Sequence, residues 1–235
     1  MSCKISPSSL SFLVRECKRC FTMKTRYGIE RPEVVFPKIF NDIDLAIKKF
    51  YDGKKSTLIV PEMPTCEFLA YSVKIKSNTI VLPENKLVYH IEGECDAIVR
   101  WEDGSFGVID YKTSSEESKT FSYYRDQMGA YSYGILHPAD SGVEFALNYP
   151  EILDCGVTTN GLIVFTPKDY AYNKESQQAS FNGTLKWVPS EYSEEKFLKK
   201  IKKIDQFVSE KVPPPSGWWC SFCKAYQRLY EAIDE

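Results

Sequence analysis

The chain has 235 residues, a formal net charge of −2 and 43% hydrophobic residues. This length suits one large domain with a buried core. The charge excludes the strongly basic composition of a protein that binds nucleic acid over its whole surface, so a local basic patch would have to serve instead. No apolar run is long enough to cross a membrane and no signal-peptide core is visible, which predicts a cytoplasmic protein with no membrane partner.

The first part of the chain is predicted to form two helices. Ser6 and Pro7 suit the cap and first position of a helix over about residues 6–17. A second helix is expected over about 41–51, where apolar residues recur on one face. Between this helix and the centre of the chain, the pattern predicts only a strand over about 74–82.

The centre of the chain has the clearest pattern. Residues 87–101 and 106–113 are rich in β-branched and aromatic residues and are separated by Asp103-Gly104, which predicts a hairpin. A helix is expected over about 120–136, and His137-Pro138 should end it.

The last part of the chain is predicted to contain a buried strand, a hairpin and a long helix. The strand is expected at 161–166, the hairpin turn at Asn182-Gly183, and the helix over about 193–210. Three prolines at 213–215 should then break the chain before a short tail. This order of elements predicts an α/β fold with a mixed central sheet flanked by helices.

Two carboxylates and a lysine mark the central hairpin as a candidate metal site. Asp110 and Lys112 are two residues apart on a predicted strand, so their side chains share one face. With Asp96 from the preceding strand they would supply carboxylate oxygens for Mg²⁺ or Mn²⁺, with the carbonyl of Tyr111 as a further ligand. Lys112 would position a metal-bound water or stabilise developing negative charge.

This interpretation depends on the register of the hairpin. A two-residue loop would place Ala97 opposite Asp110 and turn Asp96 to the wrong face. A three-residue loop at 103–105 would place Asp96 opposite Lys112, so we predict that loop or another irregularity of the same parity.

The helix that follows carries Gln127 and Tyr131 on one face, since they are four residues apart. Both could contact a phosphate or hold the lysine. The alternative for the whole segment is a surface hairpin with an ordinary Lys–Asp pair, followed by an amphipathic helix.

Two Cys-x-x-Cys pairs lie at opposite ends of the chain. Cys17 and Cys20 form the first, and Cys220 and Cys223 form the second. In a protein with reduced cysteines, such pairs predict a four-thiolate metal site. The site would join the N- and C-terminal segments, about 1–28 and 213–235, of a single domain that spans 1–235. Thiolates bind both zinc and a [4Fe-4S] cluster, so the spacing leaves both open.

The compound pattern resembles the RecB-like branch of the PD-(D/E)XK nuclease superfamily. The residues that carry the resemblance are Gly93-x-x-Asp96, Ile109-Asp110-Tyr111-Lys112-Thr113, Gln127-x-x-x-Tyr131 and the opening Ser6-Pro7-Ser8-Ser9-Leu10 with Cys17-Lys18-Arg19-Cys20-Phe21. The resemblance implies a restriction-endonuclease-like core and Mg²⁺- or Mn²⁺-dependent cleavage of DNA phosphodiesters.

The resemblance also assigns roles to single residues. It implies that Asp96 and Asp110 bind metal and that Lys112 is the catalytic lysine, with Gln127 and Tyr131 in the trailing helical motif. Many members of the branch add an upstream ligand, for which His90 and Glu67 are candidates. Many also hold a [4Fe-4S] cluster with one N-terminal and three C-terminal cysteines, whereas this chain has two and two.

We expect a DNA nuclease acting on ends or single strands, with DNA and proteins of repair, recombination or defence as partners. The alternatives are a nuclease-like protein that binds nucleic acid or scaffolds without cutting, and a redox protein built on the four cysteines. Lysines and arginines beside the first cysteine pair, or lysines on the last long helix, could contact phosphates. Trp218 and Trp219 are expected to pack around the cysteine site rather than stack on unpaired bases.

Overall fold

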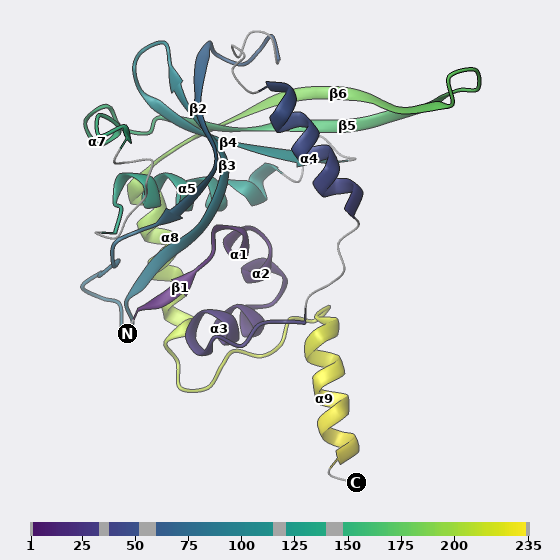
Figure 1. Cartoon of the computed structure of the whole chain (residues 1–235). Helices are drawn as coiled ribbons and strands as arrows, with labels where there is room; N and C mark the ends of the chain where they lie inside the picture. Colours follow the sequence, from purple (N-terminus) through teal and green to yellow (C-terminus); the bar gives the residue numbers. More distant parts are fainter. Residues whose placement is uncertain (1, 33–37, 52–59, 115–120, 140–147, 234–235) are drawn as a thin grey trace.

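The computed structural model describes residues 2–32, 38–51, 60–114, 121–139 and 148–233. Its centre is a mixed sheet of six strands (Figure 1). The strands are β1 (Cys3–Ile5), β2 (Cys66–Lys76), β3 (Tyr89–Trp101), β4 (Phe106–Thr113), β5 (Thr159–Asn173) and β6 (Gln178–Glu191). The helices are α1 (Pro7–Ser11), α2 (Leu13–Glu16), α3 (Lys18–Tyr27), α4 (Lys38–Tyr51), α5 (Phe121–Leu136), α7 (Ile152–Cys155), α8 (Glu194–Val208) and α9 (Ser221–Ile233).

The sheet mixes parallel and antiparallel pairs. β3 pairs antiparallel with β2 and β4, and parallel with β1. β5 lies parallel to β4 and antiparallel to β6. The sequence-based prediction of an α/β fold with a mixed sheet flanked by helices is confirmed.

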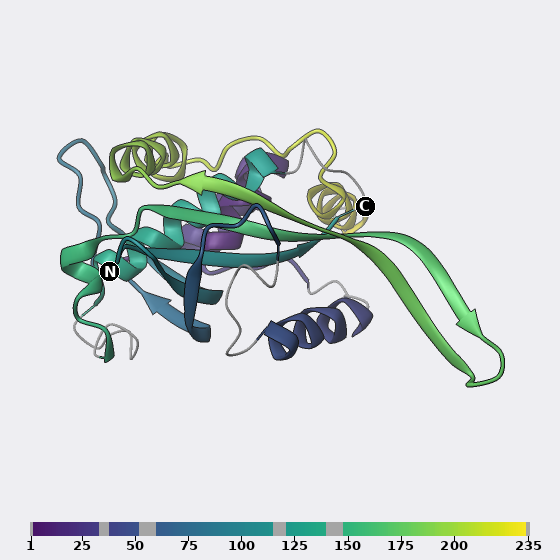
Figure 2. The ribbon, with the colours of Figure 1, turned by 90° about the horizontal axis from the view of Figure 1, so that it is seen from above.

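Helices cover both faces of the sheet. Seen from above, α4 lies on one face, while α5 and α8 lie on the other (Figure 2). Alternate residues of β4 explain the two layers, because Val108 packs in the cluster of α5 and Ile109 packs in the cluster that includes Tyr51 of α4. The face of β4 that carries Val108 therefore also carries Asp110 and Lys112, toward α5.

One edge of β3 is shared by two strands and has a gap between them. On this edge, pairing with β1 ends at Ile91 and pairing with β4 begins at Ala97. The start of α1 fills part of the gap, since a Cβ on Gly93 would lie 2.7 Å from Cδ of Pro7. Only glycine fits at this position without moving α1 or β3, which gives the first residue of the Gly-x-x-Asp pattern a packing role.

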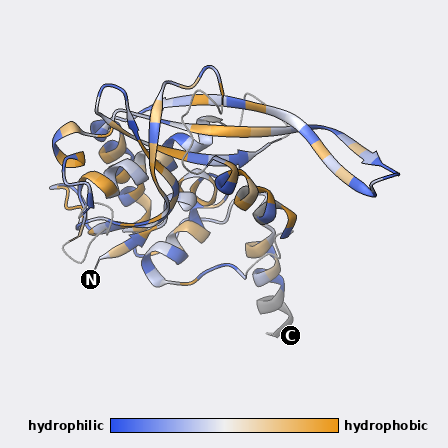
Figure 3. Ribbon diagram, turned by 45° about the horizontal axis from the view of Figure 1, so that its top comes forward, coloured by the Kyte–Doolittle hydropathy of each residue, from blue (hydrophilic) through white to orange (hydrophobic). Residues whose placement is uncertain are grey.

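The β5–β6 hairpin extends well beyond the rest of the sheet (Figures 1 and 2). Hydrophobic colour dominates its inner part, and its outer end is largely hydrophilic (Figure 3). The expected turn at Asn182-Gly183 is wrong, because both residues lie within β6 and pair with residues of β5. The chain reverses at residues 174–177 instead, where the Asn173 carboxamide oxygen accepts bonds from the backbone N–H groups of Glu175 and Ser176.

Other boundaries need smaller corrections. The first predicted helix is two helices, α1 and α2, with a break at Phe12. Of the strand expected over 74–82, only 74–76 belong to a strand, as the end of β2, which starts at Cys66. The tail after the prolines is not a short irregular segment, because it contains α9. By contrast, β4 has the predicted bounds, and α5 agrees with the predicted helix over 121–136, while residue 120 lies outside the described residues.

Candidate active site and cysteine cluster

The hairpin register brings the two aspartates together. Ala97 faces Ile109, so the next position places Asp96 opposite Asp110. The loop is Glu102–Gly104, with Gly104 at a φ of +84°, and it starts one residue earlier than predicted. The predicted parity is therefore correct, but the predicted pairing of Asp96 with Lys112 is wrong.

Asp110 is a buried carboxylate with one lysine beside it. Its residue is 1% exposed, and its Oδ2 lies 2.5 Å from Nζ of Lys112. Burial, reinforced by the nearby Asp96 carboxylate, raises the pKa of Asp110 to about 7 against the opposing effect of Lys112. A carboxyl group whose pKa is raised by burial and by a neighbouring carboxylate is a candidate for a functional site.

Asp96 lies at the point where β3 leaves β1 and joins β4. Its Oδ2 accepts a hydrogen bond from the backbone N–H of Tyr111 (2.8 Å), and its Oδ1 accepts one from Nζ of Lys48 in α4 (2.9 Å). Burial acts to raise its pKa, but the charges of Lys112 and Lys48 outweigh burial, so the pKa of Asp96 is lowered. The two carboxylates therefore differ, since Asp96 is stabilised as the anion.

Lys48 is a site residue that the sequence reasoning missed. It lies on an amphipathic helix where a lysine is ordinary, and only the packing of α4 on the sheet brings it to Asp96. Lys48 and Lys112 thus place two cations beside the two carboxyl groups.

These groups fit a hard divalent cation. Asp96 and Asp110 offer carboxylate oxygens from adjacent strands, and magnesium needs only one or two such ligands besides water. The backbone N–H of Tyr111 points to Asp96, and the carbonyl of a strand residue points to the same side as its N–H. The Tyr111 carbonyl therefore faces the same opening as Asp96.

Gln127 and Tyr131 lie together on α5, as expected, but they contact each other. Nε2 of Gln127 donates to the Tyr131 hydroxyl (2.9 Å), and Ser11 of α1 donates to Oε1 of Gln127 (3.3 Å). The lysine lies beside another residue of α5, Tyr124, whose ring centroid is 5.2 Å from Nζ of Lys112. The sequence reasoning did not select Tyr124, which precedes Gln127 by one helical turn.

The two candidates for an upstream ligand lie elsewhere. His90 is at the β1 end of β3, where its Nδ1 lies 3.0 Å from the Ser2 hydroxyl. Glu67 pairs with Arg100 at the opposite end of β3. Neither residue is close to Asp96, which lies between them along the strand.

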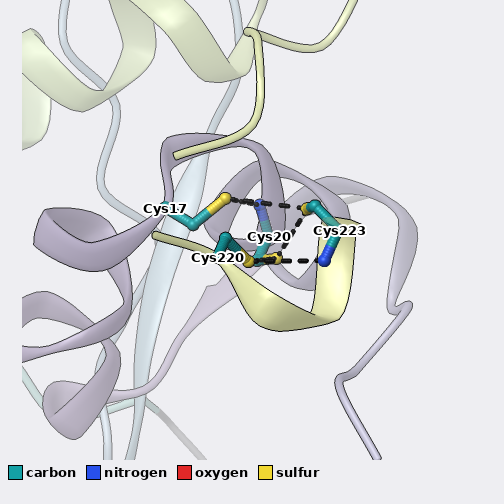
Figure 4. A group of neighbouring side chains, drawn as sticks. All are labelled: Cys17, Cys20, Cys220 and Cys223. Atoms are coloured by element: carbon teal, nitrogen blue, oxygen red, sulfur yellow. Dashed lines mark hydrogen bonds between the residues drawn. The ribbon is translucent and has the colours of Figure 1, made fainter. Parts of the chain in front are cut away.

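The four cysteines from the chain ends form one cluster. All four sulfurs lie within 4.8 Å of one another, with separations of 3.8 Å (Cys17–Cys223), 3.6 Å (Cys20–Cys220) and 3.4 Å (Cys20–Cys223). Figure 4 shows the side chains of the two pairs pointing toward one another.

Each Cys-x-x-Cys pair has the same local geometry. The backbone N–H of Cys20 points to the sulfur of Cys17 (3.4 Å), and that of Cys223 points to the sulfur of Cys220 (3.5 Å). Burial raises the pKa of Cys20 to about 11, while backbone N–H groups overcome burial and lower the pKa of Cys17 to about 7. Four thiolates this close require a cation, because their mutual repulsion opposes ionisation.

Comparison with a protein-family model agrees with the fold. The sequence profile of the PD-(D/E)XK nuclease superfamily matches residues 38–228. The chain belongs to the PD-(D/E)XK nuclease superfamily. Its members are generally metal-dependent nucleases that hydrolyse phosphodiester bonds, which implies a nucleic-acid substrate and a divalent metal.

One of the matching solved structures is titled "Crystal structure of SSO0001". It has 17% sequence identity and a TM-score of 0.49, and the match covers 95% of this chain and 84% of that chain. No curated protein matches the sequence. Among the described residues, no helix is both long and apolar enough to span a membrane.

Proposed function

We propose that this protein is a DNA nuclease whose divalent metal, Mg²⁺ or Mn²⁺, is held by Asp96, Asp110 and the carbonyl of Tyr111. The observation that carries the proposal is the juxtaposition of a buried Asp110 with Asp96 across the β3–β4 pair and with Lys112 on the same strand face. Burying the Asp110 carboxylate, with two further charged groups half-buried beside it, is costly unless these groups serve a purpose.

When bound, the metal would lower the pKa of a water molecule and polarise a phosphoryl oxygen. The protein's own part is to hold the reacting groups. Lys112 is fixed between Asp110 and the ring of Tyr124, so its ammonium is placed to stabilise negative charge that develops on the phosphate. Gln127 and Tyr131 are proposed to position the site without touching the substrate, because their hydrogen bonds join α5 to Ser11 of α1.

Lys48 has a distinct proposed role. Its ammonium is 2.9 Å from the Asp96 carboxylate, so it would share that carboxylate with a bound metal ion. We expect Lys48 to keep Asp96 ionised before the metal binds and to turn to a substrate phosphate afterwards.

The cysteine cluster is proposed to hold zinc. Four sulfurs placed tetrahedrally at a Zn–S distance of about 2.3 Å would be separated by about 3.8 Å. Three of the sulfur–sulfur separations are 3.4–3.8 Å and all of them are within 4.8 Å, which supports such a mononuclear site. A [4Fe-4S] cluster would hold its ligands farther apart, because four irons and four sulfides lie between them. Zinc has no redox chemistry, which disfavours the redox function and leaves a structural role.

The proposed substrate is DNA with ends or single strands, in repair, recombination or defence. The second candidate is a protein of the same fold that binds nucleic acid or scaffolds without cutting. The complete set of Asp96, Asp110 and Lys112 favours cleavage, because binding of nucleic acid alone does not need a buried carboxylate beside a second one.

The test is to incubate the protein with end-labelled DNA and Mg²⁺ or Mn²⁺. The wild type should give products that require the added metal, and Asp110→Asn, which keeps the size of the side chain, should give none. Binding of DNA without any cleavage by the wild type would support the scaffold function and contradict the nuclease.

A further inference from the structure

Two neighbouring tryptophans are exposed beside the cysteine cluster. Trp218 and Trp219 are 78% and 82% exposed, in contrast to Trp101 and Trp187, each 6% exposed. Their ring centroids are 6.3 Å apart and their planes are at 85°, so the rings meet edge to face. The expectation that they pack around the cysteine site is therefore wrong. Two large aromatic side chains in water are unusual, and they leave ring faces free for a ligand.

The surroundings of the tryptophans are basic. Nζ of Lys224 lies 5.8 Å from the centroid of each ring. The two segments that meet at the cysteine cluster, 17–29 and 211–228, contain no aspartate or glutamate, although the whole chain has a net charge of −2. Their lysines and arginines are Lys18, Arg19, Lys24, Arg26, Lys211, Lys224 and Arg228.

The carboxylates that flank the first segment are neutralised by ion pairs. Glu16 accepts from Arg31 at 2.9 Å, and Glu30 lies 3.4 Å from Lys24. The local surface therefore favours an anionic ligand.

The cysteine cluster holds the tryptophan segment beside Cys17, and the residues just before Cys17 contact the start of α5. The backbone N–H of Gly217, next to Trp218, points to the sulfur of Cys17 at 3.2 Å. Two residues before Cys17, Arg15 donates to the carbonyl of Ser122 at the start of α5 (3.3 Å).

The same arginine lies over an aromatic ring. Its guanidinium is 4.7 Å from the ring centroid of Tyr123, which is 38% exposed. The next residue, Tyr124, is the one that contacts Lys112. Arg15 and the two tyrosines thus lie between the segment that leads into Cys17 and the catalytic lysine.

We propose that Trp218 and Trp219 form a stacking site for the unpaired bases of single-stranded DNA, which guides a single strand toward Asp110 and Lys112. This inference rests on the proposed nuclease function and adds its substrate class and a binding site to it. Indole faces stack on any base, and cations beside them bind the phosphates, so the site would not depend on base sequence. Paired bases cannot offer their faces, which makes the site selective for single strands.

The test uses Asp110→Asn protein, so that binding is measured without cleavage. Its affinity for labelled oligo(dT) and for a duplex of equal length is compared with that of two derivatives, Trp218→Leu/Trp219→Leu and Trp218→Phe/Trp219→Phe. We expect the leucine variant to bind oligo(dT) about tenfold or more weakly, the phenylalanine variant to keep most of the affinity, and duplex binding to change little. Zinc content should be the same in all three proteins, because neither tryptophan is buried.

Intrinsic fluorescence provides a second readout that needs no further variant. Oligo(dT) should quench the emission of the exposed Trp218 and Trp219. The emission of the buried Trp101 and Trp187 should stay unchanged. Unchanged oligo(dT) affinity in the leucine variant, or an equal loss of duplex binding, would overturn the stacking site. The nuclease proposal fails separately, if the wild type binds oligo(dT) through the tryptophans but cleaves no DNA.

Discussion

Replacing Lys112 by methionine is expected to lower the rate of DNA cleavage by about 10³-fold, while binding of Mn²⁺ is retained. Removal of one group that stabilises transition-state charge typically has an effect of this size. The metal ligands Asp96 and Asp110 remain, and Asp110 loses the cation 2.5 Å away that competes with the metal. Cleavage of labelled DNA and Mn²⁺ titration of the same samples measure the two effects.

The matched control for this prediction is Lys74→Met at an exposed position of β2, which removes the same charge from the chain. It should cleave DNA at nearly the wild-type rate. An equal loss of rate in both variants would mean that overall charge matters and that Lys112 has no special role. A loss of Mn²⁺ binding in Lys112→Met would also contradict the account, because the lysine is not a ligand.

Replacing Cys220 by alanine is expected to release the zinc and to destabilise the protein strongly. Cys220 is fully buried, and it joins the C-terminal segment to Cys20 of α3 (3.6 Å). Zinc binding in small structural sites contributes about 10 kcal/mol or more at neutral pH, so a site with three thiolates loses much of its contribution to folding. Because 1 kcal/mol shifts Tm by about 2–4 °C in a protein of this size, we expect Tm to fall by about 10 °C or more.

The control is Cys155→Ala, which removes an exposed cysteine outside the cluster and should leave Tm and zinc content unchanged. Elemental analysis of the purified wild type should find zinc and no iron, and its visible spectrum should lack the absorption of an iron–sulfur cluster. Stoichiometric iron with that absorption would contradict the proposal of zinc. A Cys220→Ala protein with wild-type Tm would contradict the structural role of the cluster.

The elements around the candidate site could be predicted because their local signals are strong. β4 is an uninterrupted β-rich segment, and α5 has a long apolar face that ends before Pro138. The parity of the hairpin followed from the requirement that Asp96 and Asp110 share a site, although the loop itself starts at Glu102. Cys-x-x-Cys spacing predicted the grouping of four sulfurs from opposite ends of the chain.

What could not be predicted depends on tertiary contacts. β1 is three residues long and is held by its pairing with β3, so it has no local signature. Lys48 and Tyr124 join the site only because α4 and α5 pack on opposite faces of the sheet. The Asn182-Gly183 pair suggested a turn because Asn-Gly favours tight hairpin turns. In the structure this pair lies within β6, because the hairpin is longer than the local pattern indicates. Exposure of Trp218 and Trp219 is likewise a property of the folded surface.

The most direct test of the metal site is a crystal structure of the protein soaked in Mn²⁺, with anomalous scattering recorded to locate the ion. The account predicts a manganese peak between the carboxylates of Asp96 and Asp110, within bonding distance of both and of the Tyr111 carbonyl, and no such peak in Asp110→Asn crystals. Manganese found elsewhere in the wild type, with the Asp96 and Asp110 carboxylates still paired to Lys48 and Lys112, would contradict it.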